Sequence, residues 1–173
     1  MKPGQVIWIT GLSGSGKTTI ARNLREVLQQ KGHSVILIDG DDFRAVVDDP
    51  YIGYDIDSRL INANRICRLA KLVSDQGFLT VVATISLFHE IHDWNRQNFS
   101  NYKEILIKVP KEIRDKRRAD ARGKKNLNGR FKNVMGVDQI PEMPRYPDLI
   151  IDNSNDHSRP GYMVNQIIPL INT

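Results

Sequence analysis

The chain has 173 residues, 40% of them hydrophobic and 26% charged, with a formal net charge of +5. These values predict one globular domain, residues 1–173, with a sizeable core. No apolar run is long enough to span a bilayer and no signal peptide precedes the first expected strand, so we expect a cytoplasmic protein without a membrane partner. The single cysteine, Cys67, excludes an internal disulfide and suits a reducing compartment.

Segments typical of strands and helices alternate along the chain. Short apolar runs predict buried strands, and stretches with a helical period or a polar, basic character predict helices. In chain order we expect a strand at 6–9, a helix at 19–30, strands at 34–38 and 79–85 flanking a helix at 57–76, a strand at 104–109, a helix at 111–119, a strand at 148–152 and a helix at 162–171. This alternation predicts an α/β fold of three layers, a parallel sheet with helices on both faces.

Residues 11–18, Gly-Leu-Ser-Gly-Ser-Gly-Lys-Thr, match the phosphate-binding pattern GxxxxGK[ST] between the first strand and the first helix. Glycines let backbone N–H groups surround a polyphosphate, and the helix N-terminus adds partial positive charge. Lys17 is expected to reach the β- and γ-phosphates, and the Thr18 hydroxyl to ligate Mg²⁺. A chance Gly-Ser-rich turn is the alternative. The predicted triphosphate-binding residues are Gly11, Ser13, Gly14, Ser15, Gly16, Lys17, Thr18 and Thr19.

Asp39 and Asp41 follow the second predicted strand, at the edge of the sheet where the phosphate loop also lies. Such a pair suits a kinase, because one carboxylate can hold a Mg²⁺-bound water while the other accepts a proton from an attacking hydroxyl. The alternative is an acidic turn that caps a helix opening at residues 42–44. We favour the catalytic interpretation.

Positive charge is concentrated in residues 111–132, where ten Lys or Arg and three acids leave a net +7. This favours either a phosphate-binding lid or a nucleic-acid-binding surface. Phe131 is its only aromatic residue, and the triphosphate motif accounts for the charge. We therefore expect a lid over residues 120–146 and no nucleic acid partner, with a basic nucleic-acid-binding module as the remote alternative.

Several separated blocks resemble, in order, those of adenylylsulfate kinases. Besides the phosphate loop they are residues 39–44, 59–62, 85–86 and 133–138, followed by Pro144 and 147–149. The resemblance covers about residues 4–153 and is more specific than the loop alone. Adenylylsulfate kinases use MgATP to phosphorylate the ribose 3′-hydroxyl of adenosine 5′-phosphosulfate. The resemblance implies a P-loop kinase that uses Mg²⁺, ATP and a small nucleotide acceptor, and that forms a homodimer.

The resemblance also implies roles for single residues. Asp41 corresponds to the carboxylate near the accepting hydroxyl, Asp39 to the partner of the metal's water shell, and Arg117 to a basic lid residue near the ATP phosphates. Arginine suits the acceptor's 5′ anionic group because its planar fork donates two parallel hydrogen bonds. The implied acceptor-binding residues are Arg44, Tyr54, Arg59, Asn62, Ile85, Ser86 and Val134.

Two departures from the family concern the lid and the acceptor base. The family's Asp-Pro-Lys-Gly-Leu-Tyr is replaced by residues 118–123, Arg-Ala-Asp-Ala-Arg-Gly. In the family, a phenylalanine at the position of Val134 and another at that of Tyr54 stack on the two faces of the adenine. Stacking is worth about 1–3 kcal/mol per base. Losing one of the two aromatics predicts weaker adenine binding or a different base.

Residues 83–96 resemble a branch of adenylylsulfate-kinase-like proteins associated with capsule polysaccharide biosynthesis. One activity in that branch is cytidine diphosphoramidate kinase, whose acceptor is a cytidine diphosphate with an amide nitrogen on the terminal phosphate. Cytosine is smaller than adenine and suits a site with Val134 opposite Tyr54. The resemblance favours this acceptor, with adenylylsulfate as the alternative.

Other classes of protein fit the sequence less well. A regulatory GTPase also needs an Asn-Lys-x-Asp string, which the sequence lacks. His89 and His92 have the spacing of two metal ligands on one helix face, but no further Cys or His follows at ligand spacing. We therefore expect them on a polar helix face that borders the acceptor pocket.

Overall fold

The computed structural model describes residues 2–122, 135–154 and 160–172. Strands and helices follow the predicted order, with helices at 40–47 and 89–98 in addition to the elements expected. In chain order they are β1 (Val6–Thr10), α1 (Lys17–Gln30), β2 (Val35–Asp39), α2 (Gly40–Val47), α3 (Ile56–Asp75), β3 (Leu79–Ala83), α4 (His89–Asn98), β4 (Tyr102–Lys108), α5 (Lys111–Arg122), β5 (Leu149–Asp152), α6 (Pro160–Ile167) and the 3-10 helix η2 (Ile168–Leu170).

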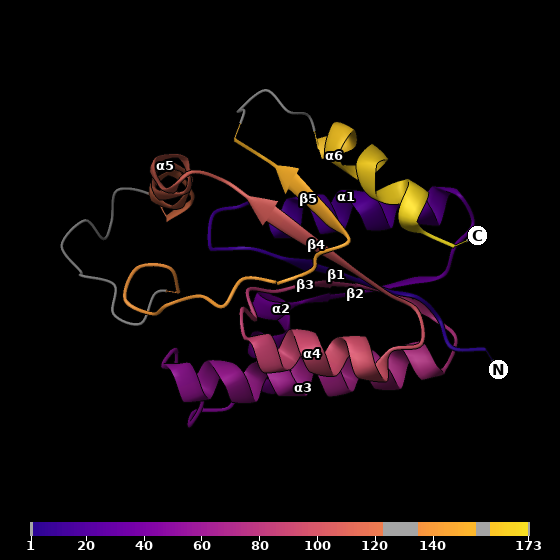
Figure 1. Cartoon of the computed structure of the whole chain (residues 1–173), viewed down its shortest axis with the longest axis horizontal. Coiled ribbons are helices and arrows are strands. Elements are labelled where there is room, and N and C mark those ends of the chain that lie inside the picture. The colour runs from indigo at the N-terminus through magenta and orange to yellow at the C-terminus, as the bar shows by residue number, and fades with distance from the viewer. Residues whose placement is uncertain (1, 123–134, 155–159, 173) are drawn as a thin grey trace.

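The strands form one five-stranded sheet in the order β2-β3-β1-β4-β5, and every neighbouring pair is parallel. Helices α1 and α6 cover one face, whereas α2, α3 and α4 lie on the other (Figure 1). Helix α5 lies beyond the carboxyl end of β4. The predicted three-layer α/β fold is confirmed, and the carboxyl ends of all the strands meet at one edge.

Alternate side chains of β1 explain why both faces of the sheet are covered. Ile7 and Ile9 pack in the cluster that includes Leu24 of α1, and Trp8 packs in the second cluster, with Ile66 of α3. All five residues of β1 are buried. A parallel strand buried on both faces needs the near-continuous apolar run found here.

The observed bounds differ from the predicted ones by a few residues in most elements, and two of these differences lie at the candidate site. Strand β3 ends at Ala83 rather than residue 85, because the chain turns at Ser86, whose φ is +25° and whose hydroxyl bonds that of Thr84 at 2.9 Å. Helix α5 continues to Arg122 and includes the first three residues of the expected lid. The rest of the lid falls partly on residues 123–134, which lie outside the described residues.

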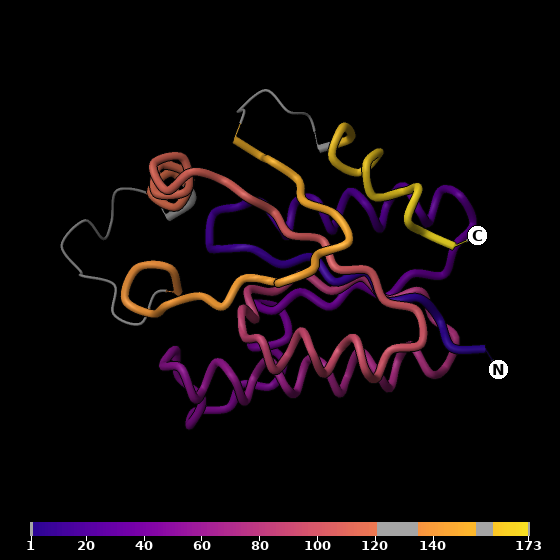
Figure 2. The backbone as a smooth tube through the Cα atoms, viewed as in Figure 1, coloured from indigo at the N-terminus to yellow at the C-terminus, as the bar shows by residue number. Residues whose placement is uncertain are grey.

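Residues 135–148, here called the return segment, lead from beyond the strand ends back along α4 to β5 (Figure 2). The backbone N–H of Glu142 donates to the carbonyl of Leu87 at 3.1 Å, and that of Asp148 to the carbonyl of Glu104 at 2.8 Å. The segment therefore runs from the phosphate loop, where Gly136 packs on Leu12, past Leu87 to the first half of β4. Among the described residues, no helix has both the length and the apolar character to cross a membrane.

Candidate active site

The phosphate loop connects β1 to α1 with two glycines in the left-handed region, Gly14 at φ +83° and Gly16 at φ +91°. Both are also tightly packed. A Cβ on Gly14 would lie 2.8 Å from the carbonyl oxygen of Arg114, and one on Gly16 would lie 2.7 Å from the side-chain nitrogen of Asn153. Conformation and space together require glycine at both positions.

Lys17 opens α1 with its Nζ folded back onto the loop, where it donates to the carbonyl of Leu12 at 3.0 Å. Burial lowers the pKa of Lys17 to about 8, and the negative charges of Asp41 and Asp39 offset this only in part. These couplings place both carboxylates within electrostatic reach of the loop lysine. The arrangement suits a cation that is completed by an anionic ligand.

Asp39 connects the loop to α2. Its side chain accepts the hydroxyl hydrogen bond of Thr18 at 2.7 Å and the backbone N–H of Asp41 at 2.9 Å, which caps α2. Asp39 is buried, whereas Asp41 is exposed on the first turn of the helix. Asp39 therefore caps a helix, as the alternative interpretation predicted, and the same side chain is the one to which the catalytic interpretation gives a role at the metal.

The hydroxyl of Thr18 and the carboxylate of Asp39 fit Mg²⁺, because both are hard oxygen ligands in contact beside the loop. Within the described ranges there is no group of three or more His, Cys, Asp or Glu side chains that could hold a metal. The ion would supply positive charge next to the transferring phosphoryl group.

The residues expected to bind the acceptor gather around Tyr54, which is 55% exposed. The guanidinium of Arg44 lies 4.5 Å and that of Arg59 5.4 Å from the centroid of its ring. Gln139 of the return segment donates to the Tyr54 carbonyl at 3.0 Å. Two cations and an aromatic ring thus stand together, a combination that suits a base bearing an anionic group.

Three further predicted acceptor residues belong to the described part of the chain. Asn62 is buried on α3 and lines a small cavity with Arg44. Ile85 and Ser86 follow β3, and the carbonyl of Ile85 accepts the hydroxyl of Thr10 from the end of β1 at 2.6 Å. Val134 lies outside the described residues.

A larger cavity of about 410 Å³ lies at the ends of β4 and β5, and its wall includes Leu12, Lys108, Val109, Arg114, Asp152 and Ser154. Arg117 is half-buried on α5, which adjoins it. Sequence reasoning missed Asn153, whose side-chain amide donates to the Ser15 carbonyl at 2.9 Å and so fixes the phosphate loop. A polar residue directly after the last buried strand was the available signal.

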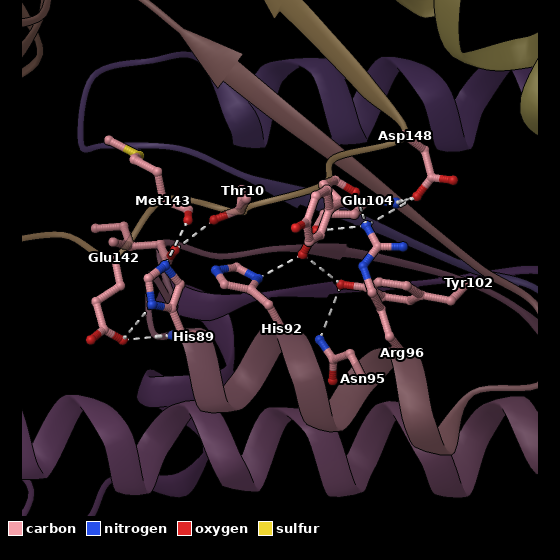
Figure 3. A network of polar contacts seen from close by, with 12 residues as sticks. Thr10, His89, His92, Asn95, Arg96, Tyr102, Glu104, Glu142, Met143 and Asp148 are labelled. Atoms are coloured by element: carbon pink, nitrogen blue, oxygen red, sulfur yellow. Dashed lines mark hydrogen bonds and ion pairs between the residues drawn. The ribbon is translucent and has the colours of Figure 1, made fainter.

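Behind the site, Glu104 of β4 is 1% exposed and joins three partners (Figure 3). Its carboxylate bonds His92 at 2.6 Å, Arg96 at 2.9 Å and Tyr102 at 3.0 Å. His89 instead bonds the Met143 carbonyl at 3.1 Å. The two histidines therefore hold β4 and the return segment against α4.

The comparisons with known proteins agree with this geometry. The family model for adenylylsulphate kinase matches residues 3–152. The chain belongs to the adenylylsulphate kinase family. It is therefore a kinase, and the resemblance found in the separated sequence blocks is confirmed.

Relatives of this adenylylsulphate kinase family member include two named enzymes. Cytidine diphosphoramidate kinase of Campylobacter jejuni is 40% identical over 151 residues, which cover 86% of each chain. Adenylyl-sulfate kinase of Clostridium acetobutylicum is 35% identical over 154 residues, covering 88% of this chain and 76% of that one. A solved Mycobacterium tuberculosis APS kinase in complex with AMPPNP and APS superposes with a TM-score of 0.85, at 26% identity and 98% coverage of both chains.

Proposed function

We propose that this kinase transfers the γ-phosphoryl group of MgATP to the ribose 3′-hydroxyl of a 5′-modified nucleotide. The observation that carries the proposal is the contact between Thr18 of the phosphate loop and Asp39, next to Asp41 on the first turn of α2. A triphosphate on the loop would then face an exposed carboxylate able to hold a sugar hydroxyl. The acceptor would lie toward Tyr54, Arg44 and Arg59.

Catalysis in such a site is mostly positioning and electrostatic stabilisation, because the transferring phosphoryl group passes through a loose transition state with charge on its oxygens. Lys17 would neutralise charge on the β- and γ-phosphates. Asp41 would orient the attacking hydroxyl and accept its proton. Lys17→Ala and Asp41→Ala are expected to lose orders of magnitude in turnover while the fold survives.

We propose cytidine diphosphoramidate as the acceptor. The identity of 40% to a cytidine diphosphoramidate kinase, against 35% to an adenylyl-sulfate kinase, supports this choice. The residue types agree, since Val134 replaces the second aromatic of the adenine sandwich and leaves Tyr54 to stack on a smaller base. Adenylylsulfate is the second candidate, because adenylyl-sulfate kinases also match most of this chain.

A coupled assay of ADP release tests both candidates. Purified enzyme with MgATP is given cytidine diphosphoramidate or adenylylsulfate, and kcat/KM is compared. We expect at least about a tenfold preference for the cytidine compound, which is the discrimination that 1.4 kcal/mol of base recognition provides. A preference for adenylylsulfate would select the second candidate. No ADP release above the Lys17→Ala background with either acceptor would contradict the assignment.

The expected oligomeric state and cellular location stay predictions. The family resemblance implies a homodimer, which light scattering on the purified protein would test. A cytoplasmic location is proposed because the single cysteine, Cys67, is free and buried and the chain has no second cysteine for an internal disulfide.

A further inference from the structure

Arg114 on α5 is a buried cation at the side of the phosphate loop. It is 6% exposed, and its Nε donates to the carbonyl of Val109 at 3.1 Å, directly after β4. Its Nη1 is buried without a hydrogen-bond partner, and no carboxylate forms a salt bridge with Arg114 in the part of the chain that the structure describes. A buried guanidinium without a counter-ion is unfavourable unless a ligand supplies one.

The surroundings of Arg114 point to where that ligand lies. The backbone of Arg114 packs on Gly14 of the phosphate loop, as the 2.8 Å approach of its carbonyl oxygen to the would-be Cβ shows. Its side chain lines the cavity of about 410 Å³ at the ends of β4 and β5. Asp152 lines the same cavity, but its Oδ1 accepts the backbone N–H of Ser154 at 2.9 Å as well as the Ser154 hydroxyl.

Charges of both signs surround Arg114: Asp115 and Glu112 of its own helix act to raise its pKa, but neither forms a salt bridge with it among the described residues. The charge of Arg114 contributes to lowering the pKa of Lys17, after the larger effect of burial. Its own pKa is lowered, first by burial and then by the neighbouring charge of Arg118, which forms an ion pair with Asp115 on the same helix. The nearby carboxylates offset the burial of Lys17 and Arg114 only in part, so the pKa of each stays lowered and an anionic ligand between them would be favourable.

Sheet order separates Arg114 from the acidic side of the site. Asp39 ends β2, and Val109, which anchors Arg114, follows β4; these strands lie on opposite sides of β1, from which the loop emerges. If the terminal phosphates of a bound nucleotide face Asp39, the rest of the nucleotide would extend from the loop toward Arg114 and the large cavity.

We propose that Arg114 binds phosphate groups of the donor nucleotide at the point where the nucleotide extends from the loop toward the cavity. This inference rests on the proposed function, because it takes ATP to be the donor. A planar guanidinium matches phosphate oxygens through paired, charge-assisted hydrogen bonds. The competing role for Arg114 is structural: to hold α5 on β4 through the Val109 carbonyl alone.

The two roles are separated by calorimetric titration of the full-length protein with MgADP and with inorganic tripolyphosphate. The variants are Arg114→Met, which keeps the buried stem, and Arg114→Lys, which keeps the charge. Lys111→Met is the matched control, since it removes an exposed positive charge from the start of the same helix. Thermal unfolding of each ligand-free protein is measured in parallel.

We expect Arg114→Met to weaken binding of both ligands about 10- to 100-fold, as the loss of a charge-assisted contact predicts. Arg114→Lys should retain part of that affinity, Lys111→Met should match the wild type, and the ligand-free Tm of Arg114→Met should not fall. Unchanged tripolyphosphate binding in Arg114→Met would overturn the inference, regardless of any change in ADP affinity or in Tm. A wild-type protein that binds neither ligand would overturn the proposed function itself.

Discussion

The hydroxyl of Thr18 donates a hydrogen bond of 2.7 Å to a carboxylate oxygen of Asp39, which joins the start of α1 to the end of β2. The same carboxylate caps α2 by accepting the backbone N–H of Asp41. One buried side chain thus fixes the distance between the phosphate loop and the acidic turn. Changing its charge without changing its shape separates structure from catalysis.

Asp39→Asn is expected to lower turnover at least about 100-fold while costing no more than about 1 kcal/mol of stability. Asparagine is a good N-cap and can still accept from the N–H of Asp41, but it lacks the charge that a metal's water shell requires. Steady-state ADP release and thermal unfolding measure the two effects. Asp42→Asn, which removes a neighbouring exposed carboxylate on the same helix, should change turnover less than about twofold.

The value of kcat/KM for MgATP should fall as pH rises above about 8, where Lys17 of the free enzyme loses its proton. Only the protonated lysine can neutralise phosphate charge, so the fall approaches tenfold per pH unit. Initial rates at limiting ATP between pH 6.5 and about 9.5 test this. A flat profile through that range would show that Lys17 keeps its proton in the free protein.

The same lowered pKa has a consequence for folding. Because the native state lowers the pKa of Lys17 from 10.5 to about 8, it disfavours the charged form, and stability rises as pH increases between these values. Lys17→Met should therefore raise the Tm by a few degrees at pH 7. The difference should shrink toward pH 10, and an equal or lower Tm at pH 7 would contradict the prediction.

Alanine substitutions at Gly14 and Gly32 distinguish the effect of backbone conformation from that of close packing. Both glycines have positive φ, +83° and +87°, but a Cβ on Gly32 would meet no atom within 4 Å. Gly32→Ala should cost about 1 kcal/mol, the penalty of a left-handed alanine, and leave ATP binding unchanged. Gly14→Ala should also displace α5 at Arg114 and weaken ATP binding at least about tenfold, for a total cost of about 2–4 kcal/mol. Thermal unfolding and ADP titration measure both, and equal effects of the two substitutions would contradict this account.

Glu104→Gln is expected to destabilise the fold by about 3–5 kcal/mol, or roughly 10 °C in Tm, because it leaves Arg96 and His92 without the carboxylate they share. Asp75→Asn, which removes an exposed carboxylate paired with Lys71, should change stability by less than about 0.5 kcal/mol. Thermal unfolding at pH 7 compares the two variants.

Burial acts to raise the pKa of Glu104, but the hydrogen bond and charge of His92, with further contributions from Tyr102 and Arg96, hold it below its ordinary value of 4.5. Its contribution to stability is therefore complete above about pH 4.5 and is lost as pH falls through the lower native value. The wild type should lose stability with acid more steeply than Glu104→Gln. Parallel acid-unfolding curves for the two proteins would show that Glu104 does not titrate in this way.

Features that depend on neighbours along the chain could be predicted from the amino-acid sequence alone. The phosphate loop, the apolar run of β1 and the alternation of strands with helices predicted the sheet and the edge where ligands bind. Local periodicity and turn chemistry carry that information within a few residues. The blocks around Asp39, Arg59 and Ser86 added the family.

Contacts between residues that are distant along the chain depend on the three-dimensional arrangement of the elements. Asn153 donates a hydrogen bond to Ser15, 138 positions away in the sequence, and the backbone of Arg114 packs on Gly14. Glu104 forms hydrogen bonds with His92 and Arg96. The local signals for such partners are weak, since a polar residue after a strand and an arginine on a basic helix are both most often solvent-exposed. Strand order, which places β4 next to β1, brings them to the site, and strand order depends on the packing of the whole sheet.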